Sequence, residues 1–83
     1  MGTREREMNK YIEKRIGQNI RSIRESRHMT QDSLAAKLQL CGCDITRSAL
    51  AKIEVGQRHL YPDEIINLKE ILGVSFDELF YGK

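Results

Sequence analysis

The sequence predicts an all-α protein, a compact bundle of five short helices. Apolar residues recur at spacings of three and four, which is the period of a helix buried along one side. The residues between them are mostly Arg, Lys, Glu, Gln and Ala, which favour helices, whereas the β-branched Val occurs only twice. With 83 residues, 40% of them hydrophobic, the chain can form one small core but not the deep substrate cavity of a large enzyme.

The first predicted helix runs from Ile16 to Arg27, because Ile16, Ile20 and Ile23 share one face and charged residues fill the others. The same spacing continues upstream to Met8 without a helix-breaking residue, which is compatible with an earlier start. Residues 1–15 are therefore expected to be a flexible or helical N-terminal extension, with residues 1–7 disordered.

The second predicted helix begins after Thr30, whose hydroxyl suits an N-cap. Asp32 falls in the first turn, where the helix dipole favours a negative charge. Leu34 and Leu38, four residues apart, give the helix its buried face, and Gly42 is a suitable left-handed terminator.

The third predicted helix begins after a second N-cap, Thr46, and stops near Val55 and Gly56. Ile45, just before it, is expected to plug the preceding turn. Three residues form the apolar stripe of this helix: Ala49, Leu50 and Ile53. Arg47, Ser48 and Lys52 point elsewhere.

The last two helices are predicted from their first turns. Pro62 is tolerated at the start of the fourth helix, and two carboxylates follow it beside the positive end of the helix dipole. Its buried face consists of Ile65, Leu68, Ile71 and Leu72, and Gly73 ends it. Ser75 and Glu78 fit a capping box for a short fifth helix. Its apolar residues Phe76, Leu79 and Phe80 are expected to close the core.

Charge is distributed unevenly along the chain. Residues 1–29 carry a net charge of +4, residues 30–61 of +1 and residues 62–83 of −3. A basic front of this kind can face phosphate, although charge alone favours a solvated helical surface with chance clustering. No segment approaches the length of an apolar membrane span and no apolar signal region is seen, so a soluble, cytoplasmic protein is expected.

Cys41 and Cys43 flank a single glycine, which is too close for an ordinary disulfide framework. Together with His28 or His59 they offer residue types that bind zinc, but a second Cys pair is missing, so free thiols in a turn are expected. No Ser, His and Asp arrangement, glycine-rich phosphate loop or carboxylate pair has supporting context. We therefore predict no enzyme activity, no metal, no cofactor and no small-molecule substrate.

Three ordered motifs carry a resemblance to a known family: Thr30-Gln31-x-x-Leu34-Ala35, then Thr46-Arg47-Ser48-x-Leu50-Ala51-Lys52-Ile53-Glu54-x-Gly56, then Leu72-Gly73-Val74-Ser75-x-Asp77-Glu78-Leu79. From about Ile16 to Phe80 the chain resembles the Cro-like phage-repressor (XRE) helix-turn-helix family. The resemblance implies a lambda-repressor-like domain over residues 16–83 that binds double-stranded DNA sequence-specifically. A repressor-like transcriptional regulator is the expected function.

The resemblance also implies roles for individual residues. The helix that starts at Thr46 is the recognition helix, which reads the major groove. Base contacts are expected from Arg47, Ser48, Ala49 and Lys52. Phosphate contacts are expected from Gln31, Thr46, Arg58 and Arg27. In such domains an arginine of the first helix pairs with the glutamate closing the recognition helix, and Arg24 and Glu54 occupy those positions as a structural clasp.

One feature departs from the family pattern, since the stretch from Gln39 to Ile45 is longer than the turn of most members. This bears on the orientation of the recognition helix and on which base edge each side chain reaches. A homodimer is expected because one short helix reads few bases. The alternative function is an antitoxin-like or adaptor protein-interaction module on the same fold, which an exposed apolar patch over the third helix would favour.

Overall fold

The structure is a computed structural model that describes the backbone of residues 2–83 and the side chains of residues 9–83. It contains five helices: α1 (Gly2–Ser26), α2 (Gln31–Leu40), α3 (Arg47–Glu54), α4 (Pro62–Leu72) and α5 (Phe76–Tyr81). No strand occurs within residues 2–83. The all-α, five-helix class predicted from the sequence is confirmed.

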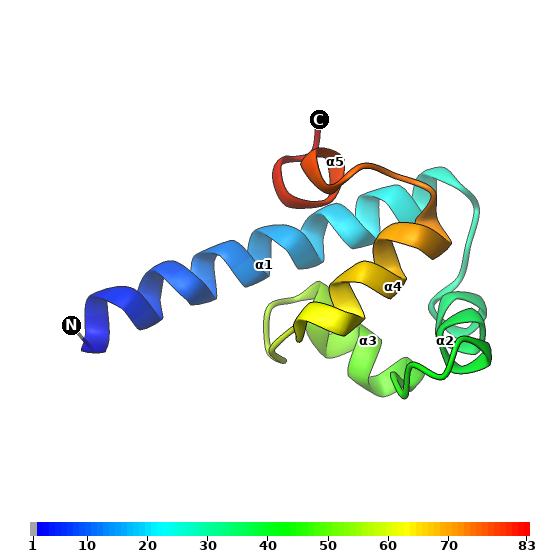
Figure 1. Ribbon diagram of the computed structural model, residues 1–83, viewed down its shortest axis with the longest axis horizontal. Helices are drawn as coiled ribbons and strands as arrows, with labels where there is room; N and C mark the ends of the chain where they lie inside the picture. Colours follow the sequence, from blue (N-terminus) through cyan, green and yellow to red (C-terminus); the bar gives the residue numbers. More distant parts are fainter. Residues whose placement is uncertain (1) are drawn as a thin grey trace.

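The helix α1 is longer than the sequence pattern required, because it begins at Gly2 and crosses residues 15 and 16 without a break. Its N-terminal half extends beyond the other four helices (Figure 1). Disorder was expected for residues 1–7; the structure places residues 2–7 in α1 instead, and residue 1 lies outside the described residues. No proline interrupts this segment, and Arg and Glu, good helix formers, make up most of it. Neither α1 nor any other helix of the described chain is long and apolar enough to cross a membrane.

Local signals set the other helix boundaries as predicted. The hydroxyl oxygens of Thr30, Thr46 and Ser75 each accept a hydrogen bond from a backbone N–H three residues further on. The carboxylate of Glu78 accepts the backbone N–H of Ser75 at 3.1 Å, which completes the predicted capping box. Gly73 ends α4 with a φ of 67°, the left-handed conformation that glycine adopts without steric cost.

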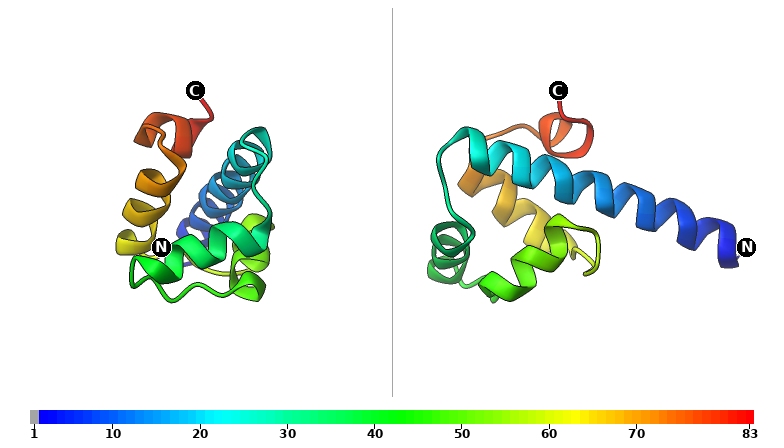
Figure 2. Two further views of the ribbon diagram at one scale, coloured as in Figure 1. Left: turned by 90° about the vertical axis from the view of Figure 1, so that its right-hand side faces the viewer. Right: turned by 180° about the vertical axis from the view of Figure 1, so that it is seen from behind.

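The core forms where the five helices pack together. In Figure 1, α5 lies on one side of α1 while α3 and α4 lie on the other, and α1 contacts all three. The helix α2 packs against α3 and α4, as the end-on view in Figure 2 also shows. The buried apolar core consists of Ile16, Ile20, Leu34, Leu38, Cys43, Ile45, Leu50, Ile53, Leu68, Leu72, Val74 and Leu79.

The prediction for the fifth helix is partly wrong. Leu79 is fully buried and Phe80 packs against the core, but Phe76 is 43% exposed. Phe76 is the first residue of α5, so its ring lies at the edge of the bundle rather than beneath it. There it stacks near Phe80, with ring centroids 6.1 Å apart, and Nζ of Lys69 lies 5.2 Å from its centroid.

A close approach of two backbones positions α3, and the sequence pattern did not reveal it. Gly17 of α1 lies against the carbonyl oxygen of Ile53, so closely that a Cβ atom at this position would clash with it. Gly56, just beyond α3, has a φ of 77° and packs against the side chain of Lys14. Because neither glycine has a side chain, the end of α3 sits directly on α1.

Candidate nucleic-acid interface

The helices α2 and α3 form a helix-turn-helix unit whose two N-termini are both capped. Thr30 accepts the backbone N–H of Ser33 at 3.0 Å, and Thr46 accepts that of Ala49 at 3.1 Å. Each cap leaves other backbone N–H groups of the first turn free to bind an acceptor outside the protein. The N-termini of both helices are therefore able to hold anionic groups such as phosphates.

The long turn between these helices is ordered by two buried side chains. Ile45 has no exposed surface, which confirms its predicted role as a plug. Cys43 is 5% exposed and is a second plug that the sequence analysis missed. The backbone N–H of Cys43 donates to the carbonyl of Leu38 at 2.9 Å, and Gly42 supplies the left-handed conformation that the turn needs. The extra residues thus fold back onto the core.

The helix α3, expected to be the recognition helix, presents one apolar face and one polar face. Leu50 and Ile53 are fully buried, whereas Arg47, Ser48 and Lys52 are exposed. Ala49, expected to make an apolar base contact, is half-buried. The exposed side chains begin at the first helical residue and follow one side of α3, as required of a helix whose N-terminal part enters a groove.

A buried charged cluster holds the C-terminal end of α3. Arg24 donates from Nε to Glu54 at 2.8 Å and from Nη2 at 3.0 Å, and it also donates to the carbonyl of Met29 at 2.8 Å. Both charged residues are buried, at 7% and 3% exposure. The clasp expected from the resemblance is therefore present. The hydrogen bonds from Arg24 to Glu54 outweigh desolvation and raise the pKa of the guanidinium.

Gln31 joins this cluster from the start of α2. Its Nε2 donates to Glu54 at 3.0 Å, so one carboxylate connects α1, α2 and α3. The amide of Gln31 is half-buried, and it retains a second N–H and its oxygen for other partners. Gln31 thus braces the C-terminal end of α3, while its outer side remains accessible.

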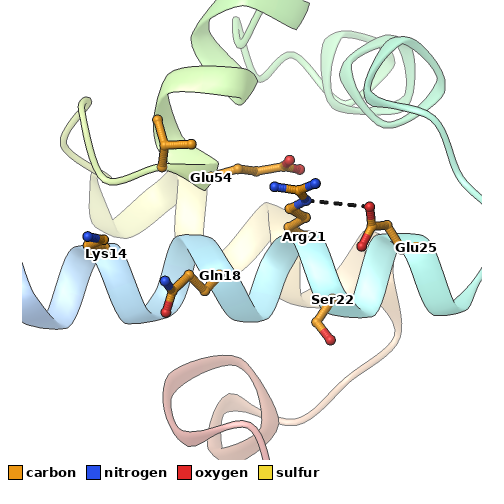
Figure 3. A pocket seen from close by; sticks show the side chains of 7 residues that line it. Lys14, Gln18, Arg21, Ser22, Glu25 and Glu54 are labelled. Carbon is orange, nitrogen blue, oxygen red and sulfur yellow. Dashed lines mark hydrogen bonds and ion pairs between the residues drawn. The ribbon is translucent and has the colours of Figure 1, made fainter.

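A groove lies beside the clasp, between α1 and the C-terminal end of α3 (Figure 3). The side chains along α1 include Lys14, Arg21 and Glu25, and Arg21 pairs with Glu25 at 3.4 Å. Glu54 borders the groove at the end of α3, with its carboxylate bound to Arg24. Because basic and acidic groups alternate here, the groove lacks the single sign of charge that phosphate recognition needs. Arg47 and Ser48 lie at the opposite, N-terminal end of α3.

Arg58, an expected phosphate contact, is bound within the protein. Its Nη1 and Nη2 donate to the two carboxylate oxygens of Glu64 at 2.9 and 3.0 Å, and Nη1 also donates to the carbonyl of His59 at 2.9 Å. Hydrogen bonding to Glu64 raises the pKa of Arg58. Burial opposes ionisation of Glu64, but the hydrogen bonds from Arg58 and from the backbone N–H of Tyr61 lower its pKa overall.

The connector after α3 is also attached to α1. The carboxylate of Glu13 accepts the backbone N–H of Leu60 at 3.1 Å and lies 2.8 Å from Nδ1 of His59. Sequence spacing carried no signal for this contact, since it joins residues 46 and 47 positions apart. Residues of the N-terminal extension therefore help to hold the loop that follows the recognition helix.

The remaining expected residues lie at the surface. Arg27 is exposed at the end of α1, and Thr46 is exposed at the start of α3. Cys41 is exposed and Cys43 is buried, and neither forms a disulfide. Among the residues that the structure describes, no group of three or more His, Cys, Asp or Glu is placed to hold a metal ion.

Comparison with known proteins agrees with this geometry. A helix-turn-helix family model matches residues 20–79, which is most of the chain and includes α2, the long turn and α3. This chain belongs to the Cro/C1-type (XRE) helix-turn-helix family. The longer turn is therefore a variation within the family, and the buried plugs at Cys43 and Ile45 show how the fold accommodates it.

One curated member of the helix-turn-helix regulators is similar in sequence. It is an uncharacterized HTH-type transcriptional regulator, YqaE, of Bacillus subtilis strain 168, and it is 35% identical over 68 residues. The match includes 82% of this chain and 54% of the relative, so the chain spans about half the length of that protein. No solved structure matches the chain.

Proposed function

We propose that this XRE protein is a non-enzymatic transcriptional regulator that represses by binding a specific double-stranded DNA sequence, with α3 in the major groove. The observation that carries the proposal is the exposed row of Arg47, Ser48 and Lys52 on α3. The opposite face of the same helix is fully buried, and its C-terminal end is clamped by Arg24. A helix held in this way presents its side chains in a fixed orientation.

The contacts divide by chemistry. Arg47 and Lys52 can donate to O6 and N7 of guanine, and Ser48 can donate or accept, whereas Ala49 offers only an apolar contact to a thymine methyl. Phosphate contacts come from Gln31, Thr46 and Arg27, together with the free backbone N–H groups at the two helix N-termini.

Arg58 has a smaller part in DNA binding than the resemblance suggested. Its charge is balanced by Glu64, which accepts from both of its terminal nitrogens. The Nε–H and one Nη2–H remain for a phosphate. Its principal role is to hold the connector after α3.

The proposal includes a homodimer that binds two half-sites about 34 Å apart, one turn of B-DNA. Exposed aromatic residues on α1 and α5 support it: Tyr11 is 65% exposed, Tyr81 56% and Phe76 43%. Arg15 lies over the ring of Tyr81, 5.7 Å from its centroid, which joins the N-terminal extension to α5 in one surface. Phe80 packs beneath this surface. Sedimentation of the free protein and of its DNA complex tests this; a monomer in both, at high protein concentration, excludes the dimer.

The experiment for base reading is a selection of duplexes from a randomised library, followed by binding curves at several salt concentrations. Arg47→Ala is expected to lose about 1 to 3 kcal/mol on the selected duplex and to lose discrimination at one base pair. Arg21→Ala is the matched control, because Arg21 is an exposed arginine outside α3. Equal losses for Arg47→Ala on selected and scrambled duplexes would remove Arg47 from the base readers.

The alternative of a protein-interaction module has less support. It requires an exposed apolar surface over α3, and the exposed large apolar side chains of the described residues include none from α3 itself. Absence of any salt-dependent binding to the library would nevertheless favour it over DNA binding.

A further inference from the structure

Arg47, the first residue of α3, lies next to an acidic residue in the first turn of α2. Nε of Arg47 is 3.6 Å from Oδ1 of Asp32. The two side chains are 66% and 71% exposed, so they face solvent on the surface that the proposed function assigns to DNA. The pair forms even though the long turn separates the two helices in sequence.

We propose that Asp32 is a positioning residue that orients Arg47 toward a guanine. This rests on the proposed function, because Arg47 must read a base for its orientation to matter. A guanidinium is planar and has five N–H donors in a fixed fork. When the Nε edge faces the Asp32 carboxylate, the end edge formed by one N–H of each terminal nitrogen stays free, and its spacing matches O6 and N7 of guanine in the major groove.

The physical effect of the pair depends on its surroundings. In the free protein both groups are hydrated, so the attraction between them is weak and screened by salt. Inside a groove the same pair loses water, and the lower dielectric strengthens its attraction. An arginine already restrained in its binding orientation also loses less side-chain freedom when it binds DNA.

Two simpler roles for Asp32 predict different behaviour. A carboxylate in the first turn of α2 stabilises that helix through its dipole. A negative charge near DNA also repels phosphates. Both effects act equally on every DNA sequence, whereas a positioning role changes the preference only at the base pair that Arg47 reads. The deciding measurement is therefore the ratio of the dissociation constants for duplexes with and without guanine at that base pair.

The test uses the full chain, the duplex selected by the unaltered protein, and duplexes with each base pair replaced in turn. Dissociation constants are measured for Asp32→Ala, Asp32→Asn, Arg47→Ala and the double variant Asp32→Ala/Arg47→Ala. Glu25→Ala is the control, because Glu25 forms a similarly exposed pair with Arg21 at 3.4 Å. Circular dichroism compares the helix content of all variants.

We expect Arg47→Ala to abolish a preference of roughly 5-fold to 150-fold for guanine at one position. Asp32→Ala is expected to lower that same preference roughly 3-fold to 10-fold and to leave the other positions unchanged. Asp32→Asn also removes the negative charge that attracts Arg47, so it should lower the same preference by a similar factor. In the Arg47→Ala background, Asp32→Ala should change no preference, and Glu25→Ala should change none either.

Several results would overturn the inference. A change in the binding of Asp32→Ala by the same factor on every duplex would make Asp32 only a source of repulsion or of helix stability. An altered preference at a different base pair, or one that persists without Arg47, would make Asp32 a reader itself. If Arg47→Ala changes no preference, base reading by Arg47 fails as part of the proposed function. If only Asp32→Ala has no effect, the positioning role fails alone.

Discussion

The buried pair of Arg24 and Glu54 is expected to dominate the stability of the junction between α1 and α3. The substitution Glu54→Ala removes the acceptor of three hydrogen bonds, two from Arg24 at 2.8 and 3.0 Å and one from Gln31 at 3.0 Å. Arg24 would remain 7% exposed in the present packing, with only the carbonyl of Met29 as a partner. The variant therefore leaves a nearly buried positive charge without its counter-ion.

The loss of unfolding free energy in Glu54→Ala follows from leaving the charge of Arg24 without its counter-ion. Removing one partner of a buried pair costs about 3 to 5 kcal/mol, because the remaining charge is neither hydrated nor paired. A domain of this size has a free energy of unfolding of roughly 5 to 15 kcal/mol. Each kcal/mol lowers the melting temperature by about 4 to 8 °C. Glu54→Ala is thus expected to lower the melting temperature by about 12 to 40 °C.

Urea unfolding followed by far-ultraviolet circular dichroism measures the effect. The exposed pair of Arg21 and Glu25 is the control, and Glu25→Ala should lose less than about 1 kcal/mol. The double variant Arg24→Met/Glu54→Leu should lose much less than the sum of its single changes, because apolar side chains of similar volume leave no unpaired charge. A loss for Glu54→Ala as small as that for Glu25→Ala would refute the reasoning, as would simple additivity in the double variant.

Three further predictions follow from packing and titration. Gly17→Ala should destabilise by about 1 to 3 kcal/mol in thermal melts, because its Cβ would clash with the Ile53 carbonyl, although alanine normally stabilises a helix; a gain in stability would contradict the close approach. Cys41 should react with iodoacetamide in the folded protein, whereas Cys43 should react only on unfolding, because Cys43 is buried and burial raises its pKa. Mass spectrometry measures both alkylation rates, and equal rates would count against the buried plug. The pKa of Glu64 is lowered in the folded protein, so its ionised carboxylate stabilises the fold above about pH 4.3, and this stabilisation is lost as the pH falls through the lower folded pKa. In Glu64→Gln the free energy of unfolding should therefore fall less at acid pH, and an unchanged dependence of that free energy on pH would contradict this.

Helix boundaries were accessible from the sequence because their signals are local. Thr30, Thr46 and Ser75 each cap a backbone N–H three residues away, and Gly73 ends α4 by its own conformation. Such interactions involve only one helical turn, so neighbouring residues suffice to predict them. The buried faces of the helices followed from periodicity for the same reason. The start of α1 was less well placed, since its N-terminal part lacks a strong capping signal.

The pairing of charged residues was only partly accessible. Arg24 and Glu54 were expected together from the family resemblance, and the structure contains the pair. Arg58 was expected to face phosphate, but Glu64 occupies its terminal nitrogens. In the sequence, the spacing of Arg58 and Glu64 did not indicate that these two residues pair. Charge pairs between elements depend on where the elements lie, and that information is absent from local spacing.

What the sequence alone determined is therefore the helix bundle, the helix-turn-helix motifs and the exposed polar side of α3. Only the tertiary structure decided that Gly17 lets α3 rest on α1, that Cys43 helps to bury the long turn, and that Asp32 meets Arg47. Each of these contacts joins segments that are apart in the chain. Their geometry arises from packing of the whole core, in which every helix constrains the position of the next.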